Sequence, residues 1–200
     1  MPVIGLTGGI ATGKSTFASA LLRELPMGHF DSDRCVHDLL AADNQIRDSI
    51  VAAFGPSVCD QAGRPERTAL RNIIFNDEKR RRTLESILHP AVHAQWKALA
   101  EEARRRETWL LVDIPLLYET QAEGEFDRVI VVASSKKTQI ERLTQERRLA
   151  PELAEKIIAS QFDLEAKTQK AEHVIWNDST RRNLDGQARL LADWLRVRFS

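Results

Sequence analysis

The sequence predicts an α/β fold with a mostly parallel sheet, and three observations lead to this prediction. Short, continuous apolar runs recur along the chain, as expected of strands that are covered on both faces. Stretches with helical spacing separate these runs, which is the pattern of βαβ units. A glycine-rich loop at residues 8–15 joins the first apolar run to the first helical stretch.

The expected strands follow one another along the whole chain. The first, at residues 2–7, leads directly into the glycine loop, and a helix is expected from residue 16. The further strand candidates are residues 28–31, 109–113, 128–133 and 173–176. Helices are expected at residues 135–148, 151–162 and 180–199, the last because Leu184, Ala188, Leu191 and Leu195 recur at helical spacing.

The interval between Asp33 and Arg106 predicts helices and no strand. Pro90 is expected in the first turn of its last helix, since proline is favoured at that position. The apolar residues with helical spacing are Leu39, Leu40, Ile46, Ile50, Phe54, Leu70, Ile73, Ile74, Phe75, Leu84, Ile87 and Leu88. Such an insertion between the second and third strands could form a wall over the glycine loop.

Composition limits the class of protein. The 200 residues suit one domain, and the chain carries 29 basic and 29 acidic residues. This balance argues against a dedicated binder of nucleic acid or of anionic membranes. Cys35 and Cys59 are expected to be reduced thiols. No signal peptide or membrane-spanning run is expected, so the sequence favours a cytoplasmic location.

Residues 8–15 read Gly-Gly-Ile-Ala-Thr-Gly-Lys-Ser, which fits the phosphate-binding pattern G-x-x-x-x-G-K-[ST]. Glycines let backbone N–H groups face a polyphosphate, and the helix N-terminus adds partial positive charge. Lys14 would reach the β and γ phosphates, and Ser15 would ligate magnesium. The alternative is a glycine-rich turn that binds nothing, but the flanking strand and helix favour a nucleoside triphosphate site.

Carboxylates at the ends of two strands are candidates for the rest of the chemistry. Asp113 closes an apolar run and could hold magnesium through water, or it could cap the following turn. Asp31 or Asp33 could accept a proton from a substrate hydroxyl. Both residues also suit a helix N-cap, and their spacing leaves the two interpretations open.

Basic residues give weaker signals. Arg142, Arg147 and Arg148 could neutralise a transferring phosphoryl group, but beside acidic neighbours they are more typical of a solvated helix face. His37 and His89 are isolated, and a lone histidine in a helical segment is more often structural than catalytic.

Taken together, these residues resemble the dephospho-coenzyme A kinase family. The resemblance covers essentially the full chain, and its motifs come in the family's order. They are the loop at residues 5–16, the D-x-D at 31–33 with His37, the His-Pro pair at 89–90, the segment at 113–119, the lid residues Arg142, Leu143, Arg147 and 160–161, and Asn177 after the last strand. Ala11-Thr12 replaces the more usual Gly-Ser of the loop, and both residues are small enough to preserve the phosphate cradle.

The resemblance implies a P-loop kinase-like three-layer fold with a mostly parallel five-stranded sheet, a helical substrate-binding insertion and a lid. It implies a single domain over residues 1–200. The core would comprise residues 1–33, 107–140 and 171–200, the coenzyme-binding subdomain residues 34–106, and the lid residues 141–170.

The resemblance also implies ATP-dependent phosphorylation of the ribose 3′-hydroxyl of dephospho-coenzyme A, with Mg²⁺. The implied catalytic residues are Asp33 as general base, Lys14 and Arg142. The implied nucleotide contacts are Gly8, Gly9, Ala11, Thr12, Gly13, Lys14, Ser15, Thr16, Arg147 and Asn177. The implied substrate contacts are Asp33, His37, His89, Pro115 and Leu116, and the implied metal ligands are Ser15 and Asp113. The expected partners are these small molecules, without nucleic acid or membrane, and a monomer is expected while an oligomer stays open.

Two rival interpretations remain. One is a kinase of another small hydroxyl compound, such as a nucleoside, shikimate or gluconate. The other is a nucleotide-switched regulatory protein, since residues 60–63 fit the D-x-x-G pattern of GTPases. No expected strand precedes that match and the guanine-reading Asn-Lys-x-Asp pattern is absent from the sequence, so we treat it as accidental.

Overall fold

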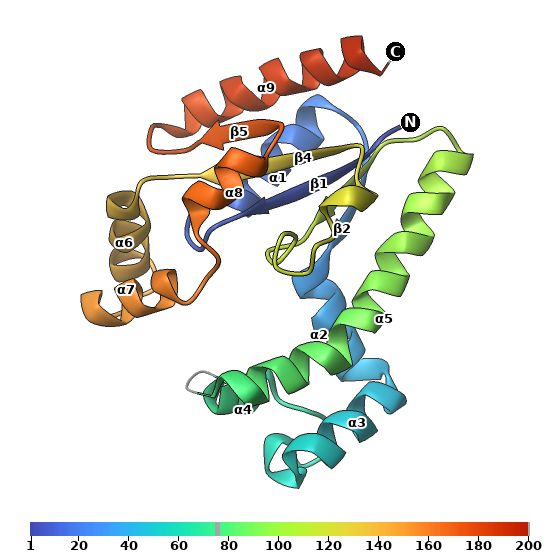
Figure 1. Cartoon of the computed structure of the whole chain (residues 1–200), viewed down its shortest axis with the longest axis vertical. Helices are drawn as coiled ribbons and strands as arrows, with labels where there is room; N and C mark the ends of the chain where they lie inside the picture. Colours follow the sequence, from blue (N-terminus) through green and yellow to red (C-terminus); the bar gives the residue numbers. More distant parts are fainter. Residues whose placement is uncertain (75–76, 200) are drawn as a thin grey trace. The chain divides into compact units, whose positions relative to one another are not determined.

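A five-stranded sheet with the order β2-β3-β1-β4-β5 organises the computed structural model, which describes residues 1–74 and 77–199 (Figure 1). The strands are β1 (Val3–Gly8), β2 (Gly28–Asp31), β3 (Leu110–Asp113), β4 (Arg128–Ala133) and β5 (His173–Trp176). β1 pairs in parallel with β3 and β4, and β4 pairs in parallel with β5. The predicted strands and the mostly parallel sheet are therefore confirmed.

The chain divides into two compact units. One comprises Met1–Phe30 and Ala100–Ser200, and the other comprises Asp31–Leu99. The first unit holds the glycine loop and four of the strands in full, and the second holds most of the predicted helical interval. The further division of the first unit into core and lid stays a prediction.

The helices of the first unit follow the predicted pattern with one exception. They are α1 (Lys14–Glu24), α6 (Lys136–Gln145), α7 (Pro151–Ala159), α8 (Leu164–Lys170) and α9 (Arg181–Arg198), with the short 3₁₀ helix η2 (Glu123–Glu125). α8 escaped prediction because the residue it buries is a lysine, Lys167, so no apolar stripe marks it. Among the described helices, none combines the length and apolarity needed to cross a membrane.

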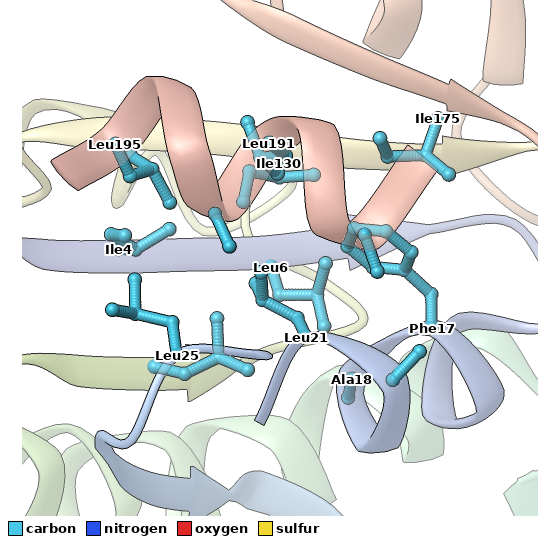
Figure 2. Close-up of a cluster of buried hydrophobic side chains, with 14 of the residues drawn as sticks. Ile4, Leu6, Phe17, Ala18, Leu21, Leu25, Ile130, Ile175, Leu191 and Leu195 are labelled. Carbon is cyan, nitrogen blue, oxygen red and sulfur yellow. The ribbon is translucent and has the colours of Figure 1, made fainter. Parts of the chain in front are cut away.

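The main core lies between the sheet and the helices α1 and α9 (Figure 2). The sheet contributes Ile4, Leu6, Leu111, Ile130, Val132 and Ile175, and the two helices contribute Phe17, Ala18, Leu21, Leu184, Ala188, Leu191 and Leu195. The helical spacing predicted for α9 is confirmed, since Leu184, Ala188, Leu191 and Leu195 are all buried. Burial of each large aliphatic side chain stabilises the fold by about 1.5–3 kcal/mol, so this layer holds β1 firmly at the centre of the sheet.

Within its described residues, the regular structure of the second unit is helical, apart from Asp31 at the end of β2 and an isolated bridge between Cys59 and Pro65. Its helices are α2 (Ser32–Ala42), α3 (Asn44–Phe54), the 3₁₀ helix η1 (Pro56–Val58), α4 (Arg67–Ile74) and α5 (Glu78–Arg105), which continues into the first unit. Phe75, which belonged to the predicted apolar set, lies outside the described residues.

The prediction that a helix begins at Pro90 is wrong. Pro90 lies inside the single helix α5. A proline in a helix interior removes one hydrogen bond and costs about 3 kcal/mol. Leu84, Leu88, Val92 and Trp96 form a stripe along the helix, and none is more than 8% exposed. Because this stripe continues across Pro90, the packing it provides outweighs the local cost and keeps one helix intact.

We expect Leu111→Ala to lower the free energy of unfolding by about 2–5 kcal/mol, because Leu111 is fully buried in the sheet and its truncation leaves a cavity. The matched control is Leu190→Ala on α9, where the side chain is 70% exposed and a change of about 0.5 kcal/mol or less is expected. Urea unfolding followed by circular dichroism measures both. Equal losses would contradict the assigned core.

Candidate active site

The glycine loop lies between the end of β1 and the start of α1, and Gly8 and Gly13 are the two of its glycines with the least room for a side chain. A Cβ on Gly8 would lie 2.4 Å from the carbonyl oxygen of Val132. A Cβ on Gly13 would lie 2.3 Å from Nδ2 of Asn177, and Gly13 has the left-handed φ of 87° that favours glycine. Both glycines are therefore required by close packing, as a functional loop demands.

The N-terminus of α1 is prepared for an anion. Its N-cap residue, Gly13, supplies no side-chain hydrogen bond, and its first turn contains no acidic residue. An α-helix leaves its first N–H groups without partners inside the helix, and the helix dipole adds positive charge there. A phosphate group satisfies both features, so the geometry supports the predicted phosphate site.

Lys14 and Asp113 meet at this site. Nζ of Lys14 forms an ion pair with Oδ1 of Asp113, and both side chains are largely buried. The contact brings together two residues that the sequence singled out separately, from the start of α1 and the end of β3.

Two oxygen-bearing side chains near the loop, those of Ser15 and Asp113, are of the kind that binds magnesium in nucleotide enzymes. The hydroxyl of Ser15 is exposed in the first turn of α1, and Asp113 contributes a carboxylate. In the described parts of the chain, no group of three or more histidine, cysteine, aspartate or glutamate residues could hold a metal. Mg²⁺ in such sites takes only one or two protein oxygens and completes its shell with phosphates and water.

Arg142 is anchored to the loop and does not lie on a solvated face. Its Nη1 donates to the carbonyl oxygen of Ala11 at 2.9 Å, and its Nη2 donates to that of Asn177 at 2.8 Å. Asn177 in turn donates from Nδ2 to the carbonyl oxygen of Thr12 at 2.8 Å. Arg147 and Arg148, by contrast, are exposed as predicted, but they follow the end of α6 at Gln145, so the predicted helix does not reach them.

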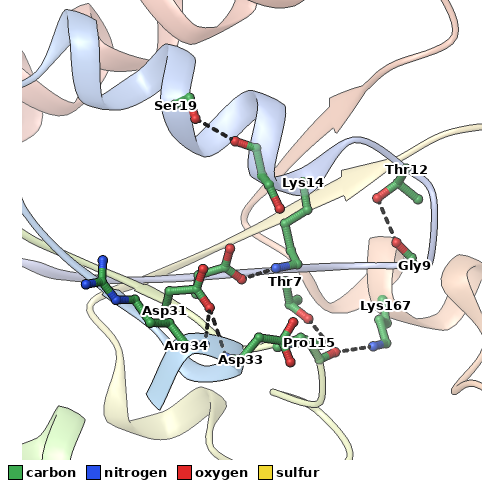
Figure 3. Close-up of polar contacts among 12 residues, drawn as sticks. Thr7, Gly9, Thr12, Lys14, Ser19, Asp31, Asp33, Arg34, Pro115 and Lys167 are labelled. Atoms are coloured by element: carbon green, nitrogen blue, oxygen red, sulfur yellow. Dashed lines mark hydrogen bonds and ion pairs between the residues drawn. The ribbon is translucent and has the colours of Figure 1, made fainter. Parts of the chain in front are cut away.

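A buried lysine that sequence reasoning missed organises the segment after β3. Nζ of Lys167 donates to the carbonyl oxygen of Pro115 at 3.0 Å and lies 2.8 Å from Oε1 of Glu119. Oγ1 of Thr7 donates to the same Pro115 oxygen at 3.0 Å (Figure 3). The one signal for Lys167 was its place one turn after Leu164, where an apolar residue would normally be buried.

The same segment contains a tyrosine that its surroundings keep protonated. Burial, together with the carboxylates of Glu172 and Glu123, raises the pKa of Tyr118 to about 12. Its hydroxyl therefore does not act as a base near neutral pH. Pro115 and Leu116, the predicted substrate contacts beside it, remain partly accessible.

In the second unit, the two aspartates of the D-x-D have different surroundings. Oδ1 of Asp31 accepts hydrogen bonds from the backbone N–H groups of Asp33 (2.9 Å) and Arg34 (3.1 Å), so Asp31 is the N-cap of α2. The Asp33 side chain is exposed in the first turn, and within the described residues its carboxylate forms no hydrogen bond or ion pair. Asp33 is therefore the unengaged carboxylate of the pair.

The two predicted histidines differ in accessibility. His37 is exposed on α2, one helical turn after Asp33, whereas His89 is half-buried on α5. Their contact with substrate stays a prediction.

A family model described as Dephospho-CoA kinase matches residues 2–183. The chain belongs to the dephospho-CoA kinase family. A relative from Symbiobacterium thermophilum with that name is 42% identical over 190 residues, covering 92% of this chain and 79% of the relative. Another from Geobacillus kaustophilus is 38% identical over 193 residues, covering 96% of each chain. The chain is therefore a kinase of this family.

Solved structures agree with the fold. TT1252 from Thermus thermophilus has a TM-score of 0.76 and 29% identity, covering 97% of this chain and 96% of its own. The dephospho-CoA kinase from Campylobacter jejuni has a TM-score of 0.63 and 23% identity, covering 96% and 95%. A shikimate kinase from Bacteroides thetaiotaomicron, with a TM-score of 0.56 and 15% identity over 97% and 98%, shares the fold alone.

We expect Gly13→Ala to weaken MgADP binding at least about tenfold, which corresponds to about 1.4 kcal/mol, because the new Cβ meets Asn177 and the left-handed backbone becomes strained. Titration calorimetry measures this affinity. The control is Gly124→Ala, where nothing lies within 4 Å of the added Cβ, and unchanged binding is expected. Normal affinity in the Gly13 variant would show that the loop is not the nucleotide site.

Proposed function

We propose that this chain transfers the γ-phosphoryl group of ATP to the ribose 3′-hydroxyl of dephospho-CoA, giving CoA and ADP. The proposal is carried by an uncapped, glycine-bounded helix start beside the Lys14–Asp113 pair, in a chain that belongs to the dephospho-CoA kinase family. Phosphoryl transfer depends mainly on positioning and on charge stabilisation, and these features supply both.

On the donor side, backbone N–H groups between Ala11 and Ser15 would hold the phosphates, with Gly8 and Gly9 shaping the start of the cradle and Thr16 its end. Lys14 would balance the charge on the β and γ phosphates. Arg142 uses two of the five N–H donors of a guanidinium on backbone carbonyls, so it retains donors for the transferring group.

On the lid side of the donor site, Asn177 would border the nucleotide through its contact with Thr12. Arg147 would join the phosphates when the predicted lid closes, which would also exclude water as a competing acceptor. Ser15 and Asp113 would hold Mg²⁺, which screens the charge of the phosphate oxygens when bound.

On the acceptor side, Asp33 would orient the ribose hydroxyl and accept its proton. The N-cap role of Asp31 supports this assignment, because it leaves Asp33 as the unengaged carboxylate of the pair. His37, His89, Pro115 and Leu116 would contact dephospho-CoA, with the helical interval as its binding subdomain.

A panel of acceptors tests the proposal. Release of ADP from ATP is measured with dephospho-CoA, shikimate, gluconate and a nucleoside, and formation of CoA is followed by chromatography. We expect turnover with dephospho-CoA alone. Turnover with shikimate and none with dephospho-CoA would replace the proposal by the rival suggested by the shared fold. Calorimetry with GTP and ATP tests the remaining rival, a GTP-dependent switch.

We expect Asp33→Asn to lower kcat by about 10²-fold or more while the melting temperature stays unchanged, because the amide does not accept a proton. Asp48→Asn provides the control, since its carboxylate belongs to the same unit and is 79% exposed. Steady-state assays with dephospho-CoA measure both variants. Turnover of Asp33→Asn close to that of the unmodified protein would remove Asp33 from the role of base.

A further inference from the structure

Three side chains from outside the phosphate loop hold two of its residues, Ile10 and Ala11. Oε1 of Gln161 accepts a hydrogen bond from the backbone N–H of Ile10 at 2.7 Å. Nε2 of Gln139 donates to the carbonyl oxygen of Ile10 at 2.7 Å, and Nη1 of Arg142 donates to that of Ala11 at 2.9 Å. We refer to Gln139, Arg142 and Gln161 as the loop clasp.

The clasp surrounds a strained point of the backbone. Ala11 has a φ of 57°, in the left-handed region. A residue with a Cβ adopts this region at a cost of about 1–2 kcal/mol, and such a conformation persists only where its surroundings enforce it. Hydrogen bonds on both sides of Ile10 and on the carbonyl of Ala11 supply that enforcement.

The packing around the clasp is close. The Gln139 side chain is 3% exposed, and a Cβ on Gly9 would lie 2.9 Å from its Nε2. A buried amide that lost its partner would carry a desolvation penalty, so Gln139 is committed to Ile10. Gln139 is therefore the deeply buried member of the three-residue clasp.

Gln161 differs from Gln139 in its accessibility. It is half-buried and lies between α7 and α8, at the wall of a cleft of about 600 Å³ that Gly9 and Gln139 also line. Gln161 is therefore a more accessible member of the clasp than Gln139, and it belongs to the segment that we predict as the lid.

We propose that Gln161 is a positioning residue for phosphoryl transfer, which stabilises the left-handed conformation of Ala11 and so preorganises the phosphate loop for the nucleotide. Because Gln161 accepts the hydrogen bond of the Ile10 N–H, the phosphates would bind the N–H groups that follow it in the loop. This hydrogen bond links the position of the segment between α7 and α8 to the conformation of the phosphate loop. The inference deepens the proposed function. It rests on one part of it, namely that the phosphate loop binds ATP as the phosphoryl donor.

Gln161→Leu tests the proposal, because leucine has a similar size but accepts no hydrogen bond. We expect the Kd for MgADP, measured by calorimetry, and the KM for ATP each to rise about 3- to 10-fold, with kcat changed less and the melting temperature nearly unchanged. Gln145→Leu is the matched control, since Gln145 is an exposed residue of α6, and neither constant should change. An unchanged affinity for MgADP in Gln161→Leu would overturn the proposal.

Rescue by glycine separates positioning from a general structural role. Glycine adopts the left-handed conformation without a Cβ penalty, so adding Ala11→Gly to Gln161→Leu should restore at least half of the lost affinity. A double variant as weak as Gln161→Leu alone would contradict the proposed link to Ala11.

The backbone N–H of Ile10 gives a second, independent readout. The backbone N–H of Ile10 should exchange with deuterium slowly in the free protein, and its NMR signal should shift in Gln161→Leu. Rapid exchange would overturn the clasp. The affinity for MgADP does not depend on the acceptor. Failure to phosphorylate dephospho-CoA would therefore overturn the proposed function, whereas the MgADP affinity of Gln161→Leu would still test the role of Gln161.

Discussion

The uncapped N-terminus of α1 is the constraint on which the rest of this structure depends. N–H groups at a helix start need partners, and here Gly13 supplies none. The helix is held in place because Phe17 and Leu21 pack into the core under the central strand (Figure 2). A helix start that is held in place and has no capping side chain has the geometry of an anion site, and polar groups from the neighbouring elements lie beside it.

The polar groups beside the start of α1 come from the ends of strands. β3 ends in Asp113, which pairs with Lys14, and Asn177, directly after β5, holds the carbonyl of Thr12. Behind this edge, Lys167 forms a buried ion pair with Glu119 and anchors Pro115. A buried pair of this kind is costly to break, since the partner left behind is an uncompensated charge, so it fixes the segment beyond Asp113.

Local sequence was sufficient for the elements whose signal lies within a few residues. Continuous apolar runs marked the strands, and the phosphate pattern marked the loop. The same local rules failed at Pro90 and at α8. At Pro90 a stripe of buried side chains along α5 outweighs the proline, and in α8 the buried residue is Lys167. In both places the deciding energy comes from contacts with residues distant in the chain, which a local pattern does not contain.

The sequence by itself therefore determined the sheet, the phosphate loop and, through its ordered motifs, the family. Only the tertiary structure separated residues that look alike in sequence. It made Asp31 a helix cap and left Asp33 unengaged, and it placed Arg142 on the loop while leaving Arg147 in solvent. The physical reason is that the role of a charged side chain follows from its burial and its partners, and both depend on how segments far apart in the chain pack together.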